Sequence, residues 1–197
     1  MSRRGPGRPR ETSHEEIRRI ARELFAEQGY AATSLVQIAR AAGISRTTLF
    51  EYFPAKRDLM WEEFESGLER LRASLDADPA RPVIEIMAGA MIAAVDYPAH
   101  EHDALRLRWR LAQADPELRA YTAVRSEQLV DLIVEHASRH RPGADPELID
   151  HTTRALAAVA ARCVEAWTQD ESPPAGLAEN VASRLAPFVA AMRPLIA

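Results

Sequence analysis

The sequence predicts an all-α protein of about nine helices, in which a small three-helix head precedes a larger helical body. Apolar residues recur with the three- and four-residue spacing of helices, and no alternating strand pattern is present. Asp-Pro pairs at Asp78, Asp115 and Asp145 are typical of a helix N-cap followed by proline in the first turn. The single cysteine among 197 residues excludes an internal disulfide framework.

The head contains three predicted helices. The first begins at Ser13 in a Ser-x-x-Glu capping box and ends at Gly29, and the second begins at Ser34 in a Ser-x-x-Gln box. A turn at Gly43, where a residue without a Cβ is favoured, leads to a third helix from Ser45. Two short helices joined by a tight turn indicate a helix-turn-helix, whose second helix enters a DNA major groove.

The third helix is expected to have one buried and one DNA-facing side. Ile44, Leu49 and Phe53 are predicted to face the head core. The residues expected to contact DNA are Thr33, Ser34, Arg46, Thr47, Thr48, Phe50, Tyr52 and Lys56. Among them, Arg46 has the donors for a bidentate pair with guanine, or for a phosphate.

The other expected contacts follow from side-chain chemistry. Methyl and ring surface on Thr47 and Phe50 suits thymine methyl groups, and the hydroxyls of Thr48 and Tyr52 suit phosphate oxygens. A second phosphate is expected at the start of the second helix, bound by the hydroxyl and free N–H groups at Thr33 or Ser34. Lys56, expected at the N-terminus of a fourth helix, adds a positive charge there.

The exposed Glu51 has two interpretations, because it places a negative charge on the reading face. It can accept from a cytosine amino group, or form an ion pair with a neighbouring arginine such as Arg46 without contacting a base.

Charge is distributed unevenly along the chain. Residues 1–57 hold 11 Lys and Arg against 6 Asp and Glu, whereas the rest hold 14 against 23. A basic head on an acidic body is typical of a DNA-binding domain. The arm that precedes the head contains Arg3, Arg4 and Arg8 among glycines and prolines. These arginines either enter a minor groove or make loose phosphate contacts from a solvated tail.

The body is predicted to contain six helices. Apolar spacing from Met60 to Leu75 marks the first of them, and Pro187 is expected to kink the last. The other predicted spans are 82–95, 101–114, 116–140, 146–169 and 174–195. The expected organisation is a disordered basic arm at 1–11, a helix-turn-helix domain at 12–58 and a helical effector-binding and dimerisation domain at 59–197.

The head resembles the TetR family of bacterial transcriptional regulators in two stretches, ELFAEQGYAATSLVQIARAAGIS and TLFEYFPAKRDL. The chain also resembles the mycofactocin-associated subgroup of that family, in SHEEIRRIARELFAEQGY and FPAKRDLMWEEFESGLERLRASL. The resemblance implies three head helices followed by six body helices, and DNA contacts at the positions named above. Phe50 departs from the family pattern, which often has tyrosine there, so one hydroxyl contact is lost.

The resemblance also implies that the middle helices enclose a small-molecule effector. Candidate ligand-binding residues are Met87, Met91, Leu105, Trp109, Tyr121 and Trp167. Methionine repacks around irregular apolar shapes, but the same residues at helical spacing also suit a plain core. Because few charges lie on the apolar stripes, we expect a largely apolar effector, and the subgroup resemblance implies an acyl-CoA.

The last two helices are rich in alanine, which allows close helix packing. The resemblance implies a homodimer formed through them, and close packing within one subunit is the alternative. A dimer also fits the DNA argument, because one short recognition helix contacts too few bases for useful specificity.

Histidines and the cysteine are interpreted structurally. The pairs His100 with His102 and His136 with His140 have ligand-like spacing, but no cysteine or carboxylate cluster accompanies them, so we expect surface residues and no metal. Cys163 is expected to be a small buried hydrophobe.

The sequence thus predicts a cytoplasmic, homodimeric repressor of double-stranded operator DNA, released by a small effector. No cofactor, catalytic residue or membrane span is expected, because phosphate loops, nucleophile motifs and long apolar runs are lacking. The alternative is a DNA-binding activator or a constitutive regulator without an effector.

Overall fold

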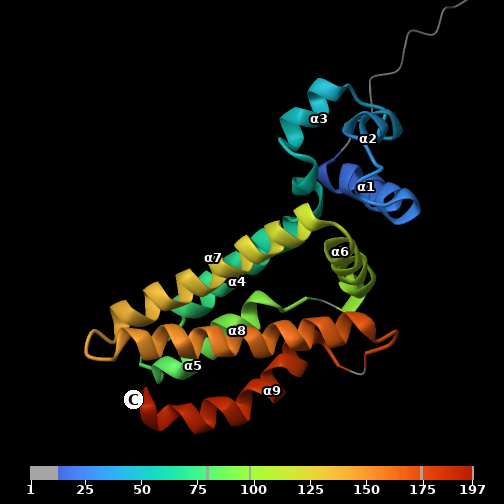
Figure 1. Cartoon of the computed structure of the whole chain (residues 1–197). Coiled ribbons are helices and arrows are strands. Elements are labelled where there is room, and N and C mark those ends of the chain that lie inside the picture. Colours follow the sequence, from blue (N-terminus) through green and yellow to red (C-terminus); the bar gives the residue numbers. More distant parts are fainter. Residues whose placement is uncertain (1–12, 79, 98, 174, 197) are drawn as a thin grey trace, which may run out of the picture. The chain divides into compact units, whose positions relative to one another are not determined.

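The computed structural model describes residues 13–78, 80–97, 99–173 and 175–196. The regular elements in these residues are helices and none is a strand, so the all-α prediction is confirmed. The chain forms two compact units, which we call the head unit (residues 1–60) and the body unit (residues 61–197). Figure 1 shows the helices of both. The head unit contains α1 (His14–Gln28), α2 (Leu35–Ala41), α3 (Arg46–Tyr52) and the 3-10 helix η1 (Lys56–Met60).

Local hydrogen bonds set the helix ends of the head unit. The hydroxyls of Ser13, Ser34 and Ser45 each accept from a backbone N–H in the first turn of the helix that follows. At Ser34 the capping box is complete, because its own backbone N–H donates to the side chain of Gln37 over 2.7 Å. Gly43, between α2 and α3, has a φ of 69°, which glycine adopts without strain.

The head core lies between α1, α2 and α3. Leu49 and Phe53 are buried, whereas Ile44 is only partly buried. Thr33 is 1 % exposed, and its hydroxyl donates to the carbonyl of Gly29 over 2.8 Å. These contacts attach the α1–α2 link to the core, so the orientation of α2 and α3 is set by packing.

Lys56 differs from its expected position at the start of the fourth helix. It lies in η1, which packs against α1, and α4 (Glu62–Asp76) begins only after Trp61. The carboxylate of Asp58 accepts from the backbone N–H of Ala55 over 2.8 Å, which holds the turn that enters η1. The apolar spacing that predicted one helix from Met60 onward therefore covers the end of η1 and all of α4. The spacing does not reveal the break between these two elements.

The body unit follows the predicted order of helices. After α4 come α5 (Val83–Ala94), the short η2 (Ala99–Glu101), α6 (His102–Ala114), α7 (Pro116–His140), α8 (Pro146–Gln169), α9 (Leu177–Met192) and the short η3 (Arg193–Leu195). Asp115 and Asp145 cap α7 and α8 as expected, each followed by proline. Pro187 lies inside α9.

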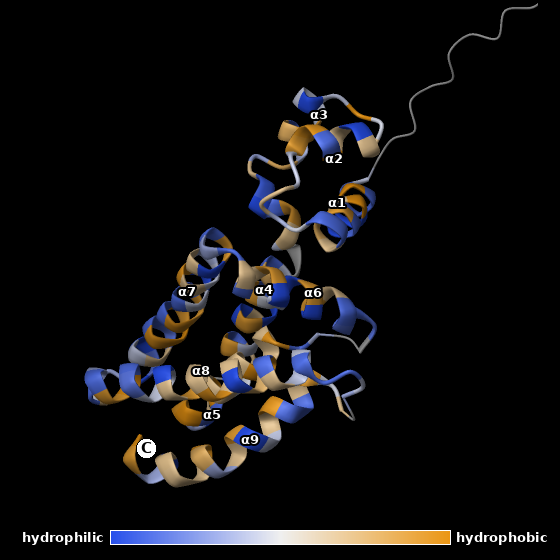
Figure 2. Ribbon diagram, turned by 45° about the vertical axis from the view of Figure 1, so that its right-hand side comes forward, coloured by the Kyte–Doolittle hydropathy of each residue, from blue (hydrophilic) through white to orange (hydrophobic). Residues whose placement is uncertain are grey.

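The body core forms around α5, which is apolar on nearly every side. Ile84 and Met87 are fully buried, and residues of α4, α7, α8 and α9 pack into the same cluster. Figure 2 shows α5 mainly in the hydrophobic colour. Helices α4 and α5 pack closely at Gly67, where an added Cβ would lie 2.6 Å from the carbonyl oxygen of Ala94. None of the helices in the described ranges is both long enough and apolar enough to cross a membrane.

Candidate nucleic-acid interface and effector cavity

The exposed face of α3 carries the expected DNA-reading side chains. Arg46, Thr47, Phe50 and Glu51 are exposed, whereas Leu49 on the opposite face is fully buried. The structure therefore confirms the predicted division of this helix into a face that packs on the core and a face that is exposed. A helix of two turns with this pattern can enter a major groove.

Arg46 and Phe50 form a pair on this face. The guanidinium carbon of Arg46 lies 5.2 Å from the centroid of the Phe50 ring. No ion pair joins Arg46 to Glu51, although the structure describes both residues. The ring restricts the arginine to the outward face of α3, where its donors are available to a guanine or a phosphate.

A depression beside α3 brings together residues from three segments of the head unit. It is lined by residues 31–36, Arg46 and Lys56. The lining includes Ser34, which was predicted, and the exposed Val36 in the first turn of α2. Sequence reasoning missed Val36 because α2 is too short to show a clear apolar stripe. Positive charge beside free helix N–H groups suits a phosphate of the DNA backbone.

Two of the predicted contacts are changed by packing. The hydroxyl of Thr33 donates into the head unit, so this side chain does not present it to a phosphate and Ser34 remains the candidate. The ammonium of Lys56 donates to the carbonyls of Tyr30 over 2.8 Å and Thr33 over 3.1 Å, and lies 3.9 Å from the Tyr30 ring centroid. A lysine ammonium has three N–H donors, so one remains for DNA.

Thr48 and Tyr52 are both partly buried. The hydroxyl of Thr48 is 2.9 Å from that of Ser45, and the ring of Tyr52 packs edge-on against His14 at 4.6 Å. The arginines of the arm, Arg3, Arg4 and Arg8, lie outside the described residues.

The body unit contains an apolar cavity of about 180 Å³. Its walls come from α4, α5, α6, α7 and α8 and the segment that follows α5. Lining residues are Trp61, Phe64, Met91, Val95, Tyr97, Leu105, Arg108, Trp109, Ala112, Thr122, Arg125, Ser126, Leu129, Val130, Ala157, Ala160, Ala161 and Val164.

The structure separates the predicted ligand residues into lining and core. Met91, Leu105 and Trp109 line the cavity. Met87 is fully buried in the core, and Tyr121 packs against Trp61 with ring centroids 5.4 Å apart. The remaining candidate, Trp167, is also buried, and its indole N–H donates to the carbonyl of Ala175 over 2.9 Å.

Sequence reasoning missed the two arginines of the cavity. Arg108 lies between the rings of Trp61 and Tyr97, at 5.5 and 5.4 Å from their centroids. The guanidinium of Arg125 lies 4.6 Å from the Phe64 ring and forms an ion pair with Glu65 of α4. The only signal in the sequence is an arginine beside the apolar stripe, which equally suits a solvated face.

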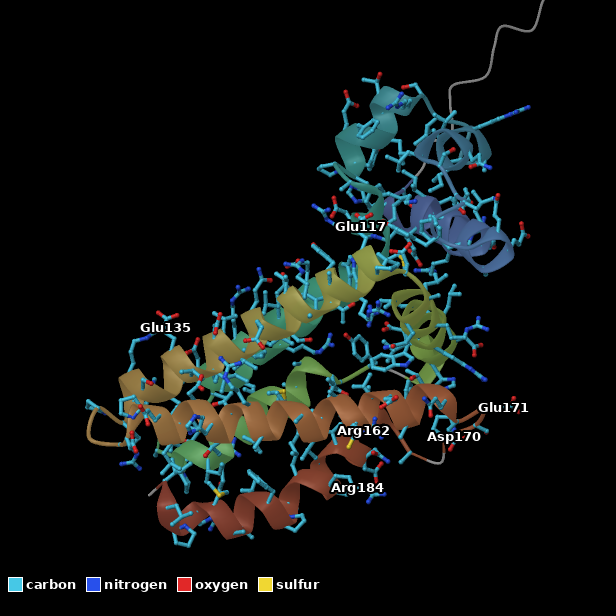
Figure 3. The ribbon with its side chains drawn as sticks, viewed as in Figure 1. Glu117, Glu135, Arg162, Asp170, Glu171 and Arg184 are labelled. Carbon is cyan, nitrogen blue, oxygen red and sulfur yellow. The ribbon has the colours of Figure 1, made fainter. Side chains whose placement is uncertain are left out.

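Helices α8 and α9 present small side chains to solvent. Exposed residues on them include Ala158, Ala166, Ala186 and Ala190. A shallow groove between the helices is flanked by Arg162 and Arg184, which Figure 3 shows projecting from α8 and α9. Such a surface suits close helix packing with another helix pair.

Two of the histidines that were expected on the surface are buried. His102 and His136 are 8 % and 6 % exposed. The ring nitrogen Nε2 of His102 is 3.1 Å from the carbonyl of Trp167, and the rings of His136 and His140 stack at 4.0 Å. Tertiary packing of α6 on α8 and of α7 on α4 buries them, which spacing along one helix does not reveal. Within the described residues, no group of three or more potential metal ligands occurs.

Acidification is expected to destabilise the protein in part through His136. Burial, and then the neighbouring His140, lower the pKa of His136, while Asp76 opposes this shift and Arg139 adds to it. Below about pH 6.5, His136 is therefore protonated in the unfolded chain while it is still neutral in the folded chain. The stabilising contribution is complete above that pH and is lost as the pH falls through the lower folded value.

Urea denaturation at pH 7.5, 6.5 and 5.5 measures this effect. A His136→Gln variant should lose less unfolding free energy on acidification than the unaltered chain does. The exposed His151 of α8 provides a matched control, and His151→Gln should keep the original pH dependence. If His136→Gln left the pH dependence unchanged, the burial of His136 would not be its origin.

Cys163 is buried, as expected, and burial raises the pKa of its thiol. At neutral pH this thiol is protonated and poorly nucleophilic, which fits a packing role in α8.

Comparisons with known proteins agree with the architecture of both units. The family model described as bacterial regulatory proteins of the tetR family matches residues 17–62, and the model described as the MftR C-terminal domain matches residues 81–192. A Mycobacterium tuberculosis protein described as the mycofactocin biosynthesis transcriptional regulator MftR is 32 % identical over 168 residues, covering 84 % of this chain and 85 % of its own. The transcriptional activator FasR of Mycolicibacterium smegmatis is 24 % identical, covering 87 % and 80 %.

Two solved structures resemble the whole chain. The FadR repressor of Thermus thermophilus, in complex with lauroyl-CoA, is 26 % identical, with a TM-score of 0.57 and coverage of 90 % of this chain and 93 % of its own. NalD, the secondary repressor of a multidrug efflux pump in Pseudomonas aeruginosa, is 25 % identical, with a TM-score of 0.59 and coverage of 89 % and 92 %. All four proteins are regulators and none is an enzyme.

Proposed function

We propose that this chain, which belongs to the TetR family of bacterial transcriptional regulators, is a homodimeric repressor that a small, largely apolar effector releases from a pseudo-palindromic operator. That it is a DNA-binding transcriptional regulator follows from the family. The observation that carries the finer proposal is the combination of an exposed reading helix in the head unit with an apolar cavity in the body unit. We place this function in the bacterial cytoplasm, where chromosomal operators lie.

On the DNA, Arg46, Thr47 and Phe50 of α3 read the major groove, while Ser34 and Lys56 contact phosphates. The depression beside α3 supports this division, because it places Arg46 and Lys56 at the N-terminus of α2. Two copies of α3, related by a two-fold axis, read two half-sites. The arginines of the arm add affinity through phosphate or minor-groove contacts.

The homodimer is assigned to α8 and α9. Exposed alanines on both helices and the groove between them support this, since small side chains allow helices of two copies to approach closely. Arg162 and Arg184 beside the groove provide charges that can set the register of the two copies.

We expect the chain to sediment as a dimer in analytical ultracentrifugation. Ala186→Arg should shift it toward monomer, because a long charged side chain on the exposed face of α9 prevents the close approach of a second copy.

The effector binds in the body cavity, where Met91, Leu105 and Trp109 provide apolar contacts. Release from DNA requires the effector to bind the DNA-incompetent conformation more tightly, typically by about 1–3 kcal/mol. The lauroyl-CoA complex of the similar FadR repressor supports an apolar, acyl-like molecule as the kind of effector to test first.

Fluorescence anisotropy tests the proposal, with duplex DNA from immediately upstream of this chain's gene and a scrambled duplex at the same salt concentration. Tight, salt-dependent binding that prefers the upstream duplex is the expected result. Addition of an effector should then lower the affinity for that duplex. Equal weak binding to both duplexes would place the operator elsewhere, and no binding at low salt would contradict DNA recognition by α3.

An activator without effector-controlled release is the second candidate. The similarity to the activator FasR favours it. The two functions differ in a reporter assay, because deletion of a repressor raises expression from its target promoter whereas deletion of an activator lowers it.

A further inference from the structure

The exposed part of the cavity wall lies on two neighbouring helices, α7 and α8. Among the lining residues that the structure describes, only Ser126 of α7 and Ala161 of α8 are exposed. The others are buried or partly buried, and Met91, Leu105 and Val130 are among the buried ones. A residue that lines a cavity and is also exposed lies at the rim of that cavity. Ser126 and Ala161 therefore mark its mouth.

The paths of α7 and α8 explain why the mouth lies there. Figure 1 shows the two helices joined by the turn of residues 141–145 and diverging away from it. Arg154 of α8 is paired with Glu127 of α7 over 2.7 Å, which ties the helices together on the side of the turn. The lining residues of α8 lie between Ala157 and Val164, so they come after this pair, where the helices separate.

The inner wall provides apolar contacts, and its charged groups already have partners in the protein. Arg108 donates to the hydroxyl of Tyr97 over 3.3 Å, and Arg125 is paired with Glu65. Two N–H groups, the indole Nε1 of Trp61 and the Nε of Arg125, have no partner but almost no accessible surface, so an occupant does not reach them. A polar group placed inside would therefore lose its hydrogen bonds to water without replacement.

We infer that an elongated amphipathic effector enters the cavity end-on between α7 and α8. Its apolar end lies against Met91 and Leu105, and its polar end remains in water at the mouth beside Ser126 and Ala161. This inference rests on the proposed function and adds the class of effector and its direction of entry. The buried wall selects the apolar chain, whereas the mouth tolerates different head groups, because a head group that stays in water keeps its hydration.

A series of probes with one ten-carbon chain tests the orientation. Decanol has one small polar end, decyl maltoside has one large polar end, and 1,10-decanediol has a hydroxyl at each end. Titration calorimetry on the full chain, below the micelle-forming concentrations, should give decanol and decyl maltoside similar dissociation constants. The diol should bind about tenfold more weakly or worse, because one of its hydroxyls must enter the apolar interior.

Three results of this series would overturn the inference. Binding of decanol without binding of decyl maltoside would mean that the cavity is closed, since an enclosed site has no room for a disaccharide. Equal affinity for decanol and the diol would contradict entry by the apolar end. Failure of decanol to bind would contradict an alkyl chain as the occupant.

Stopped-flow fluorescence of the uncharged dye N-phenyl-1-naphthylamine tests the route of entry. Ser126→Phe and Ala161→Phe place a ring in the mouth, so they should slow association and dissociation together and change the dissociation constant less. Ala123→Phe, at an exposed alanine of α7 that does not line the cavity, is the matched control and should keep both rates. Ser126 is not on the α8 and α9 surface assigned to the dimer, so its variant separates closure of the mouth from loss of the dimer.

Unchanged rates in both phenylalanine variants would place the entry elsewhere and overturn the inference. A weaker dissociation constant without slower rates would do the same, because it would show a filled cavity and not a blocked mouth. Operator anisotropy on the same samples distinguishes these failures from failure of the proposed function. A chain that binds its operator but shows none of the probe effects contradicts only the mouth, whereas a chain that binds no operator contradicts the proposed function.

Discussion

An Arg46→Ala variant should lose about 2–6 kcal/mol of operator-binding free energy, a roughly 30- to 2×10⁴-fold weaker affinity. A bidentate arginine–guanine pair provides about 1–3 kcal/mol of discrimination, and the proposed homodimer would contain two copies of it. Arg46 is exposed on α3 and held beside the Phe50 ring, so its side chain loses little conformational freedom when it binds DNA. The loss should be largest for the operator and small for scrambled DNA.

Anisotropy at fixed salt measures both affinities. Arg139→Ala, at an exposed arginine of α7 paired with Glu135, removes the same charge from the body unit and should leave operator affinity nearly unchanged. A uniform loss on operator and scrambled duplexes would assign Arg46 to a phosphate instead of a base. An unchanged operator affinity would contradict the role of α3 altogether.

The second large effect concerns the close approach of α4 and α5. In Gly67→Ala, the new Cβ would lie 2.6 Å from the carbonyl oxygen of Ala94, a backbone atom that can move only with its helix. We expect the free energy of unfolding to fall by about 1–3 kcal/mol, the usual cost of inserting a methyl group into a packed site.

Gly89 of α5 provides the matched control. There an added Cβ meets the Ser74 hydroxyl oxygen at 3.5 Å, an ordinary van der Waals contact. Since alanine is the better helix former, Gly89→Ala should raise the unfolding free energy by about 0.5–1 kcal/mol. Urea denaturation compares the two variants, and a rise of the unfolding free energy in Gly67→Ala as well as in Gly89→Ala would contradict the close approach of α4 and α5 at Gly67.

Much of the architecture could be predicted because its signals are local. The Ser34 capping box and the Asp-Pro pairs at Asp115 and Asp145 are formed by residues within one turn of each other. They marked the starts of α2, α7 and α8 correctly, and the observed α7 and α8 have the predicted spans. Apolar spacing likewise identified Leu49 and Phe53 as core residues of the head unit.

The site was less predictable, because helical periodicity gives a face but not its surroundings. Met87 and Met91 are four residues apart on α5, yet the first is in the core and the second lines the cavity. Thr33 was expected to present its hydroxyl to DNA, but it donates to carbonyls nine and four residues earlier. Such outcomes depend on which element packs opposite, and no local pattern contains that information.

Caps, turns and apolar spacing therefore specify an all-α chain with a helix-turn-helix, since each of these signals acts over a few residues. Packing between distant segments specifies the rest. It buries His102 and His136, binds Lys56 to the carbonyls before α2, and brings Arg108 of α6 and Arg125 of α7 to one cavity. Long polar side chains can lie in water or along an aromatic wall, and only the neighbours supplied by the fold select between the two.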